Sequence, residues 1–272
     1  GALSVTGTSD FTVSSTNAMT LTQANDFTGA VTLSSGSGAV QLTDSTDTIL
    51  AASILVGNLT VTSSGAITQT GPLLVAGTSD FTVSGSNAMT LTSTSNDFVG
   101  AVTLASGTGA VQLTDSTDTI LAASTLGGSL AVVSSGAITQ TGVLSVTGTS
   151  DFTVSGTNAM TLTQANAFTG AVTLSSGTGA VQITDSGTLT LATSTLGGDL
   201  TASADTIDLG SAITLTSGGN MTLGGTTGGI TATGAATLKA AGNLDINNNI
   251  TTLGRLTLTA DSDPSGAGDL TF

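Results

Sequence analysis

The sequence repeats itself at a fixed interval. The octapeptide GTSDFTVS occurs three times, 70 and then 71 residues apart, at residues 7–14, 77–84 and 148–155. Self-similarity at one period is typical of solenoids and related arrays, in which a repeat cannot bury its apolar face alone and stacks on its neighbours. The repeat therefore favours a fold that grows by stacking similar units.

The repeats cover most of the chain. We predict that residues 1–272 form a single β-solenoid. Its internal repeats are 1–70 (repeat 1), 71–141 (repeat 2) and 142–200 (repeat 3, partial), with degenerate coils over 201–272.

Each repeat contains a shorter rhythm of apolar-polar-apolar triplets, such as LSV (3–5), FTV (11–13) and MTL (19–21), with Gly, Ser, Asn or Asp between them. Alternation with period two, together with many Thr and Val residues, predicts strands, and the separators are turn formers. Strands this short are stable only when they stack. The sequence therefore predicts an all-β, right-handed parallel β-helix with about three short strands per coil.

This fold allows specific expectations. We expect three coils of about 23 residues in each repeat, roughly twelve coils overall, and stacking of like residues over like. Under this stacking, Asn17, Asn87 and Asn158 would form an amide ladder. The expected core plugs are six equivalent phenylalanines, namely Phe11, Phe81, Phe152, Phe27, Phe98 and Phe168.

Repeat 2 is one residue longer than repeat 1, because LTQANDF (21–27) becomes LTSTSNDF (91–98). We expect a surface turn there, since loops tolerate insertions. The alternative fold is a string of immunoglobulin-like β-sandwiches, which would need longer strands and a core Trp or Tyr; the chain contains neither residue.

The charge of the chain excludes several partners. Lys239 and Arg255 are its only basic residues against 17 acidic ones, giving a net charge of −15. Nucleic acids and anionic membranes are bound through clusters of Lys and Arg, so we expect neither as a partner. No apolar run of 18 residues occurs, so we expect no membrane insertion. No signal peptide opens the chain, and we expect any such segment to lie outside it.

Several stretches resemble the repeat region of filamentous-haemagglutinin-like proteins. They are ANDFTGAVTLSSG (24–36), AITQTG (66–71 and 137–142), STLGGDLTASADTIDLG (194–210) and AGNLDINNNITTLGRLTLTA (241–260). These proteins are large exported adhesins of Gram-negative bacteria that use two-partner or autotransporter secretion. The resemblance implies a β-helical shaft, an extracellular or outer-surface location, and host, neighbouring-cell or matrix components as partners.

Several residue types that commonly act in enzyme active sites are missing, since the chain has no His, Cys, Tyr or Trp. Carboxylates recur as Asp44 with Asp47 and as Asp115 with Asp118, whereas repeat 3 keeps only Asp185. A pair that one repeat discards is more typical of turn capping than of acid–base chemistry. We therefore expect no enzyme activity and ordinary solvated roles for Lys239 and Arg255. A carbohydrate-active β-helix remains the alternative.

One segment is a candidate calcium site. DSDPSGAGD (261–269) places Asp261, Asp263 and Asp269 in a spacing similar to the start of an EF-hand loop. It has Ser265 at position five and Phe272 in place of the bidentate Glu, so an Asp/Gly turn is the competing interpretation. No other cofactor is expected. The Gly-rich stretch GGTTGG (224–229) lacks the Lys of a phosphate loop and is expected to form tight turns.

These observations together predict a structural and adhesive rod segment of a secreted or surface-bound adhesin. One alternative is a subunit of an extracellular filament that self-associates end to end through its terminal coils. The predicted outward face is rich in Thr, Ser and Asn and poor in aromatic side chains, so we expect any adhesion to be weak and multivalent.

Overall fold

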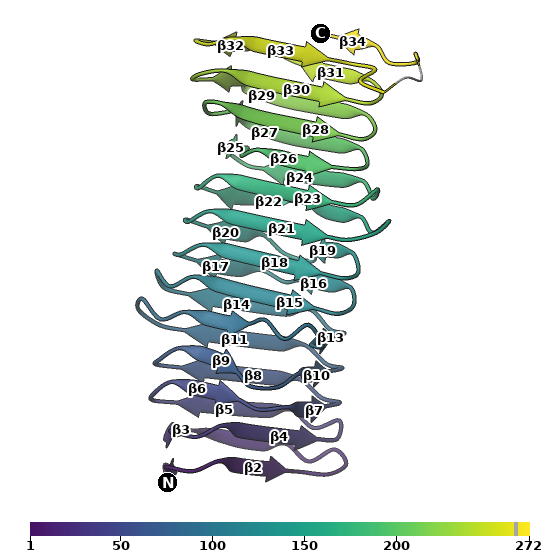
Figure 1. Cartoon of the computed structure of the whole chain (residues 1–272). Helices are drawn as coiled ribbons and strands as arrows, with labels where there is room; N and C mark the ends of the chain where they lie inside the picture. Colours follow the sequence, from purple (N-terminus) through teal and green to yellow (C-terminus); the bar gives the residue numbers. More distant parts are fainter. Residues whose placement is uncertain (264–265) are drawn as a thin grey trace. The chain divides into compact units, whose positions relative to one another are not determined.

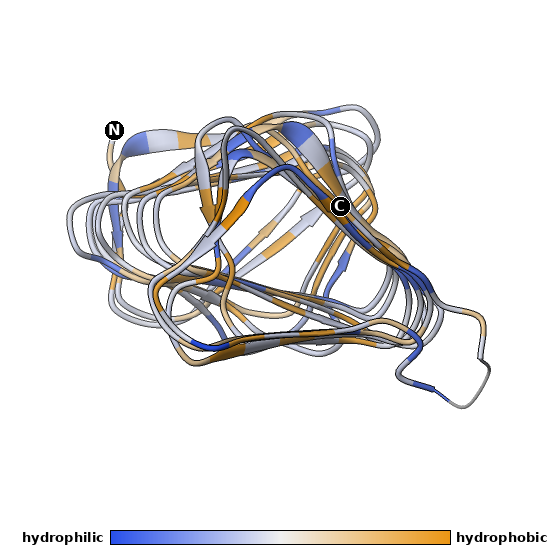
Figure 2. Ribbon diagram, turned by 90° about the horizontal axis from the view of Figure 1, so that it is seen from above, coloured by the Kyte–Doolittle hydropathy of each residue, from blue (hydrophilic) through white to orange (hydrophobic). Residues whose placement is uncertain are grey.

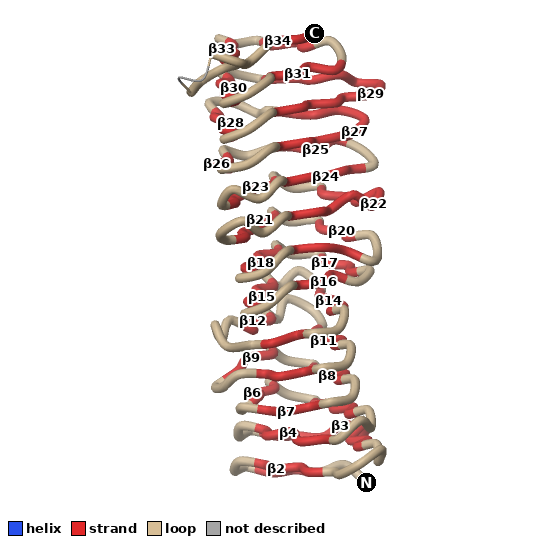
Figure 3. Tube along the Cα trace, turned by 90° about the vertical axis from the view of Figure 1, so that its right-hand side faces the viewer, coloured by secondary structure: helices blue, strands red, loops and turns tan. Residues whose placement is uncertain are grey.

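The computed structural model describes residues 1–263 and 266–272, and every regular element in them is a β-strand (Figures 1 and 3). The chain divides into two compact units, Gly1–Ser134 (unit 1) and Ser135–Phe272 (unit 2), which we describe separately. Each unit is a parallel β-solenoid, and together they make about 13 turns. The described residues include no helix that could cross a membrane.

Eighteen strands form unit 1. They are β1 (Ser4–Val5), β2 (Ser9–Thr12), β3 (Met19–Phe27), β4 (Val31–Ser35), β5 (Val40–Asp44), β6 (Thr48–Leu50), β7 (Ser53–Leu55), β8 (Leu59–Ser63), β9 (Ile67–Gln69), β10 (Leu73–Val75), β11 (Ser79–Val83), β12 (Met89–Leu91), β13 (Asp97–Phe98), β14 (Val102–Ser106), β15 (Val111–Asp115), β16 (Thr119–Leu121), β17 (Ser124–Leu126) and β18 (Leu130–Ser134).

Unit 2 follows the same scheme. Its strands are β19 (Ile138–Gln140), β20 (Leu144–Val146), β21 (Ser150–Val154), β22 (Met160–Phe168), β23 (Val172–Ser176), β24 (Val181–Asp185), β25 (Thr188–Thr190), β26 (Ser194–Leu196), β27 (Leu200–Asp208), β28 (Ile213–Ser217), β29 (Met221–Ala232), β30 (Ala236–Ala240), β31 (Leu244–Asn247), β32 (Ile250–Thr252), β33 (Leu256–Thr259) and β34 (Leu270–Thr271).

Strands of successive coils pair in parallel. β2 pairs with β4, β5 pairs with β8, and β28 pairs with β30, all in continuous register. In Figure 1, β2 and β4 run from left to right at the front while the chain climbs, which is the right-handed sense expected for parallel crossovers. The parallel β-helix is thus confirmed. The immunoglobulin-like alternative is wrong, because a sandwich is built from antiparallel strands.

The core follows the predicted alternation. In β4, Val31, Leu33 and Ser35 are buried, while Thr32 and Ser34 between them point outward. Figure 2, seen from above, shows hydrophobic (orange) residues interspersed with paler, more polar ones around the coils. Alternate residues of a strand face opposite sides, so each coil contributes two or three apolar side chains per strand to the interior.

The phenylalanines pair inside the coils. Phe81 and Phe98 are fully buried, and their ring centroids lie 5.9 Å apart in an edge-to-face arrangement. Phe152 with Phe168 and Phe11 with Phe27 repeat this geometry, although Phe11 is only half-buried. The prediction of phenylalanine core plugs is therefore confirmed, with Phe11 the least buried of the six.

The coils are shorter than predicted. Successive partners lead from Met19 through Val40 and Leu59 to Ser79, so three coils take 60 residues. A 70-residue repeat therefore makes about three and a half coils, not three coils of about 23 residues. The short GS-rich turns explain the difference, since most of them contribute only three or four residues to a coil.

Because each repeat ends half a coil away from where it began, equivalent strands of repeats 1 and 2 lie on opposite sides of unit 1. β2 in repeat 1 pairs with β4, whereas its equivalent in repeat 2, β11, pairs with β8 and β14 in the other sheet. Like residues therefore do not stack on like, and this part of the prediction is wrong. One sequence is compatible with both sheets because only the inward-outward alternation has to match.

The predicted amide ladder is also absent. The backbone of Asn17 contacts Gly38 of the next coil so closely that a Cβ on Gly38 would not fit. Asn87 instead donates its side-chain amide to the carbonyls of Ser64 and Ser84, at 2.7 and 2.9 Å. Asn87 therefore caps an individual turn.

Two local expectations have mixed outcomes. The segment that takes up the insertion is exposed: Thr22–Ala24 form an outward bulge within β3, and repeat 2 has a turn there between β12 and β13. The GGTTGG stretch is not a turn between strands. It lies within β29, where the register jumps from Ala204–Gly225 to Thr206–Gly229, so that residues 226–228 form a bulge.

Buried serines allow a first prediction. Among the described residues, Ser79 Oγ has no hydrogen-bond partner, whereas Ser124 Oγ accepts from Leu104 N (3.0 Å) and donates to Ala122 O (2.9 Å). We expect Ser79→Ala to leave the free energy of unfolding unchanged or raise it by about 1 kcal/mol. Ser124→Ala should lower it by about 2 kcal/mol, because it leaves the amide of Leu104 unpaired. Urea denaturation checks both, and equal losses in the two variants would contradict the assignment.

Candidate functional site

The most polar part of the interior is a turn that begins at the end of β5 and recurs at β15. Asp44 is fully buried, and its Oδ1 accepts hydrogen bonds from Thr46 N (3.2 Å) and Phe27 N (3.4 Å). Asp115 has the same contacts with Thr117 N and Phe98 N. Each carboxylate also accepts from threonine hydroxyls. These carboxylates close a turn and bind the coil beside it.

The sequence pairs Asp44 with Asp47, and the structure separates their roles. Asp47 is exposed, and its Oδ1 accepts from Ala66 N in the next coil at 2.8 Å. Asp44 is directed inward to other amides. The turn-capping interpretation of both residues is confirmed. Acid–base catalysis at this pair would require two carboxylates facing one substrate, and these face different sides of the chain.

A buried asparagine in the neighbouring coil completes each turn, a role that was not expected from the sequence. Asn96 is fully buried; its Oδ1 accepts from Leu73 N (2.9 Å), and its Nδ2 donates to the carbonyls of Leu91 (3.3 Å) and Thr114 (3.1 Å). Asn25 and Asn166 make equivalent contacts. The available signal was that Asn precedes the Asp-Phe or Ala-Phe step in all three repeats.

Two of these asparagines also pair with a glutamine. Gln69 Nε2 donates to Asn96 Oδ1 at 2.8 Å, and Asn96 Nδ2 donates to Gln69 Oε1 at 3.0 Å. Gln140 and Asn166 form the same amide–amide pair in unit 2. The result is a satisfied polar network that joins three coils, which is the condition under which buried polar groups stabilise a core.

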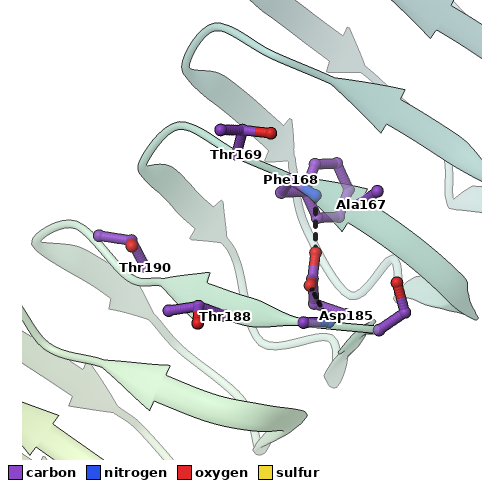
Figure 4. Close-up of a pocket in the computed structure, with 8 residues that line it drawn as sticks. Ala167, Phe168, Thr169, Asp185, Thr188 and Thr190 are labelled. Carbon is purple, nitrogen blue, oxygen red and sulfur yellow. Dashed lines mark hydrogen bonds between the residues drawn. The ribbon is translucent and has the colours of Figure 1, made fainter.

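Repeat 3 differs from repeats 1 and 2 at this turn, and a hollow of about 290 Å³ lies there beside Asp185 (Figure 4). Gly187 stands where repeats 1 and 2 have Thr46 and Thr117, and Ala167 stands where they have Asp26 and Asp97. In repeats 1 and 2 these side chains hydrogen-bond to each other. Repeat 3 has therefore lost both partners of one contact together, and the two residues that replace them line the hollow.

The hollow offers little for catalysis. Asp185 is its one acidic residue, and the carboxylate already accepts from Phe168 N (2.6 Å) and Gly187 N (2.7 Å). Most of the other lining side chains are hydroxyls and methyl groups, among them Ser186, Thr188 and Thr190. The lining thus contains one carboxylate, whereas most glycoside hydrolases use two.

A family model for repeats of unknown function (DUF5649) matches residues 1–34, 37–105 and 108–175, more than half of the chain. The chain belongs to this family. No curated protein and no solved structure matches the chain. Each of the two long DUF5649 matches contains one buried Asp and one buried Asn of the capped turns, Asp44 with Asn96 and Asp115 with Asn166.

The candidate calcium segment lies outside the DUF5649 matches. Asp261 Oδ1 accepts from Gly266 N at 3.0 Å and from Ala267 N at 3.3 Å, which is a turn-capping contact. Pro264 and Ser265 lie outside the described residues. Over the rest of the chain, no three acidic side chains gather in a way that could hold a metal ion, so Asp261, Asp263 and Asp269 are not brought together. Calcium binding stays a prediction.

The two basic residues lie apart from the capped turns. Lys239 points outward from β30 between Thr216 and Thr259 of the neighbouring strands, and Arg255 is exposed just before β33. Their exposure agrees with the solvated roles expected from the sequence.

The Asp115 carboxyl gives a pH-dependent prediction. Burial raises the pKa of Asp115 above its ordinary value of 3.8, and the Asp97 carboxylate adds to this, while amides of Thr117 and Phe98 act against it. The folded state therefore binds this proton more tightly than the unfolded state does. The resulting contribution to the free energy of unfolding is complete below pH 3.8 and is lost as the pH rises through the folded-state pKa.

Asp115→Asn removes this titration. We expect the variant to gain stability relative to the parent as the pH rises from about 4, with a slope difference of up to about 1.4 kcal/mol per pH unit. Urea denaturation at a series of pH values measures it. Parallel pH profiles for parent and variant would contradict the raised pKa.

Proposed function

We propose that this chain is a structural and adhesive shaft segment of an exported bacterial adhesin, without catalytic activity. The observation that carries the proposal is the ladder of main-chain hydrogen bonds that joins successive coils within each unit, as between β2 and β4 and between β28 and β30. Among the described residues, no helix or inserted domain interrupts the strands of either unit. Such a ladder resists extension because each coil is bonded to the next along its whole edge.

The polar interior supports a non-catalytic role. The buried carboxylates of Asp44, Asp115 and Asp185 are all engaged by backbone amides, so their contribution is to hold turns. A carbohydrate-active site would need carboxylates that face a bound sugar.

The resemblance to filamentous-haemagglutinin-like repeats supports export to the outer surface of a Gram-negative bacterium or release from it. A chain without cysteine suits secretion through an outer-membrane pore in an unfolded form. Host, neighbouring-cell or matrix surfaces are the proposed partners, and the aromatic-poor outward face supports weak, multivalent contact.

Multivalent display tests the adhesive role. We expect beads that carry many copies of the full chain to adhere to matrix-coated surfaces, while the monomeric chain at equal mass binds below detection. Beads that carry an unrelated β-solenoid of similar charge are the control. Equal adhesion of both bead types would contradict the adhesive role.

Two further measurements test the shaft and the absence of catalysis. Small-angle X-ray scattering of the chain should give the profile of an elongated particle, and a compact profile would contradict the shaft. Incubation with a panel of anionic and neutral polysaccharides should release no new reducing ends. Turnover of any of them would contradict the non-catalytic assignment and favour the carbohydrate-active alternative.

A further inference from the structure

Exposed apolar side chains gather on one outward surface of unit 1. Ile54, Val56 and Val99 are 61, 57 and 58 % exposed, although each is a large aliphatic residue. All three lie on or beside the ladder formed by β4, β7, β10 and β13. A cluster of this kind is more informative than single exposed residues, which are common on protein surfaces.

The strand register places these side chains in two adjacent rows. Ile54 is paired with Leu74, and Leu74 with Asp97, in the first row. The next paired residues along the strands are Leu55, Val75 and Phe98, which are buried. The residues directly after them form the second row, namely Val56, Ala76 and Val99. We call Ile54, Val56, Leu74, Ala76 and Val99 the apolar groove.

Three shallow hollows follow this surface and share residues with one another. The middle hollow, about 150 Å³, is lined by the apolar groove together with Asp97. It shares Ile54 with a hollow of about 240 Å³ that reaches Asp10. It shares Asp97 and Val99 with a hollow of about 470 Å³ that reaches Asp118 and Ile120. The apolar groove is therefore continuous across coils, with carboxylates at both ends.

The fold does not require apolar residues here. The other repeats have small or polar residues at the equivalent positions: Thr125 for Ile54, Gly127 for Val56, Ser145 for Leu74, Thr147 for Ala76 and Thr169 for Val99. Equivalent strands keep their buried residues almost unchanged, so the differences are concentrated on the outward face. Five changes toward apolar character on one surface indicate a contact that the other repeats do not make.

We propose that the apolar groove binds an extended polypeptide segment of another protein, in which a central run of aliphatic residues is flanked on both sides by Lys or Arg. The aliphatic residues would cover Ile54, Leu74 and Val99, and the basic residues would meet the carboxylates of Asp10, Asp97 and Asp118. The inference goes beyond the shaft role and holds whether or not that role is correct.

Charge decides between this occupant and a second molecule of the same chain. The chain carries a net charge of −15 with two basic residues, both in unit 2, so a second molecule would bring mostly like charge to an acidic rim. No aromatic side chain lines the three hollows at their surface, which disfavours a sugar ligand held by ring stacking. A basic and aliphatic peptide complements both features of the surface.

A labelled peptide tests the proposal. The ladder from β2 to β13 spans five strands, about 20 Å, so an extended peptide of about eight residues covers it. We expect the full chain to bind an eight-residue Lys–Val peptide, with four central Val residues and two Lys residues at each end, in fluorescence anisotropy, with an affinity that falls as salt rises. The same peptide with Glu in place of Lys, or with Ser in place of Val, should bind at least about tenfold more weakly.

The repeats themselves supply the variant. Ile54→Thr, Val56→Gly, Leu74→Ser and Val99→Thr, combined in one protein, introduce only residues that the same backbone positions carry elsewhere in the chain. We expect this protein to fold and to bind the Lys–Val peptide at least about tenfold more weakly than the parent. Val133→Thr is the matched control, because Val133 is an exposed valine outside the three hollows and Thr62 stands at its equivalent in repeat 1.

The outcomes separate the alternatives. Loss of binding in the four-residue variant with retention in Val133→Thr supports the proposal. Equal binding by parent and variant would show general attraction to an acidic chain and overturn it. Absence of Lys–Val binding would also overturn it, as would a dimer of the parent in sedimentation that the variant abolishes, since the occupant would then be a second molecule.

Discussion

Asn96→Leu is expected to destabilise the chain by about 4 kcal/mol, more than any single surface change. Leucine has a similar volume but cannot accept from Leu73 N or donate to the carbonyls of Leu91 and Thr114, which the native side chain satisfies. These backbone groups stay buried in the variant, and each unpaired buried group costs about 1–3 kcal/mol. Urea denaturation followed by circular dichroism measures the loss.

Hydrogen exchange localises the effect. The amide of Leu73 should lose protection in Asn96→Leu by a larger factor than amides of β2 and β4, because the network joins only the coils around Asn96. Asn87→Ala is the matched control: Asn87 also donates to two carbonyls, but at the surface. We expect it to cost less than about 1 kcal/mol. Losses of equal size in the two variants would show that the buried network adds nothing.

Phe81→Ala is expected to lower the free energy of unfolding by about 4 kcal/mol. Phe81 is fully buried in β11 between Val61 and Leu104 of the adjacent strands, and its ring packs edge-to-face on Phe98. Truncation removes the burial of the ring and leaves a cavity that the paired strands cannot close, since both are held by main-chain bonds.

Phe11→Ala is the control for this prediction, because Phe11 occupies the equivalent position in repeat 1. Phe11 packs on Phe27 with the same geometry but is only half-buried, so we expect a loss of about half that of Phe81→Ala. Both losses are measured by urea denaturation. The interpretation fails if Phe11→Ala is the more damaging change.

The solenoid could be predicted from local pattern. Alternation with period two in segments such as VTLSS (31–35) defines which side chains face inward, and the Gly- and Ser-rich separators leave too little chain for a helix or a long loop. The capping role of Asp44 was likewise predictable, because Asp in a turn accepts from nearby amides. These features depend on residues close together in the sequence.

The buried network was not predictable in the same way. Asn96 looks like an ordinary turn residue, and its main partners, Gln69, Leu73 and Thr114, lie 27, 23 and 18 residues away. Which residues face one another across coils depends on the exact number of residues per coil. The predicted coil was about three residues too long, and this error alone led to the expectation of an asparagine ladder that the structure does not contain.

Local pattern is sufficient to predict that the chain is all-β, that its strands are short, and which side chains point inward, because alternation and turn composition act within a few residues. The coil length, and with it the half-coil offset between repeats 1 and 2 in unit 1, is visible only in the folded chain. The coil length brings Ile54, Leu74 and Asp97 into one row and so creates the apolar groove. The physical reason is that lateral neighbours in a solenoid are set by the sum of all turns between them, which no local pattern specifies.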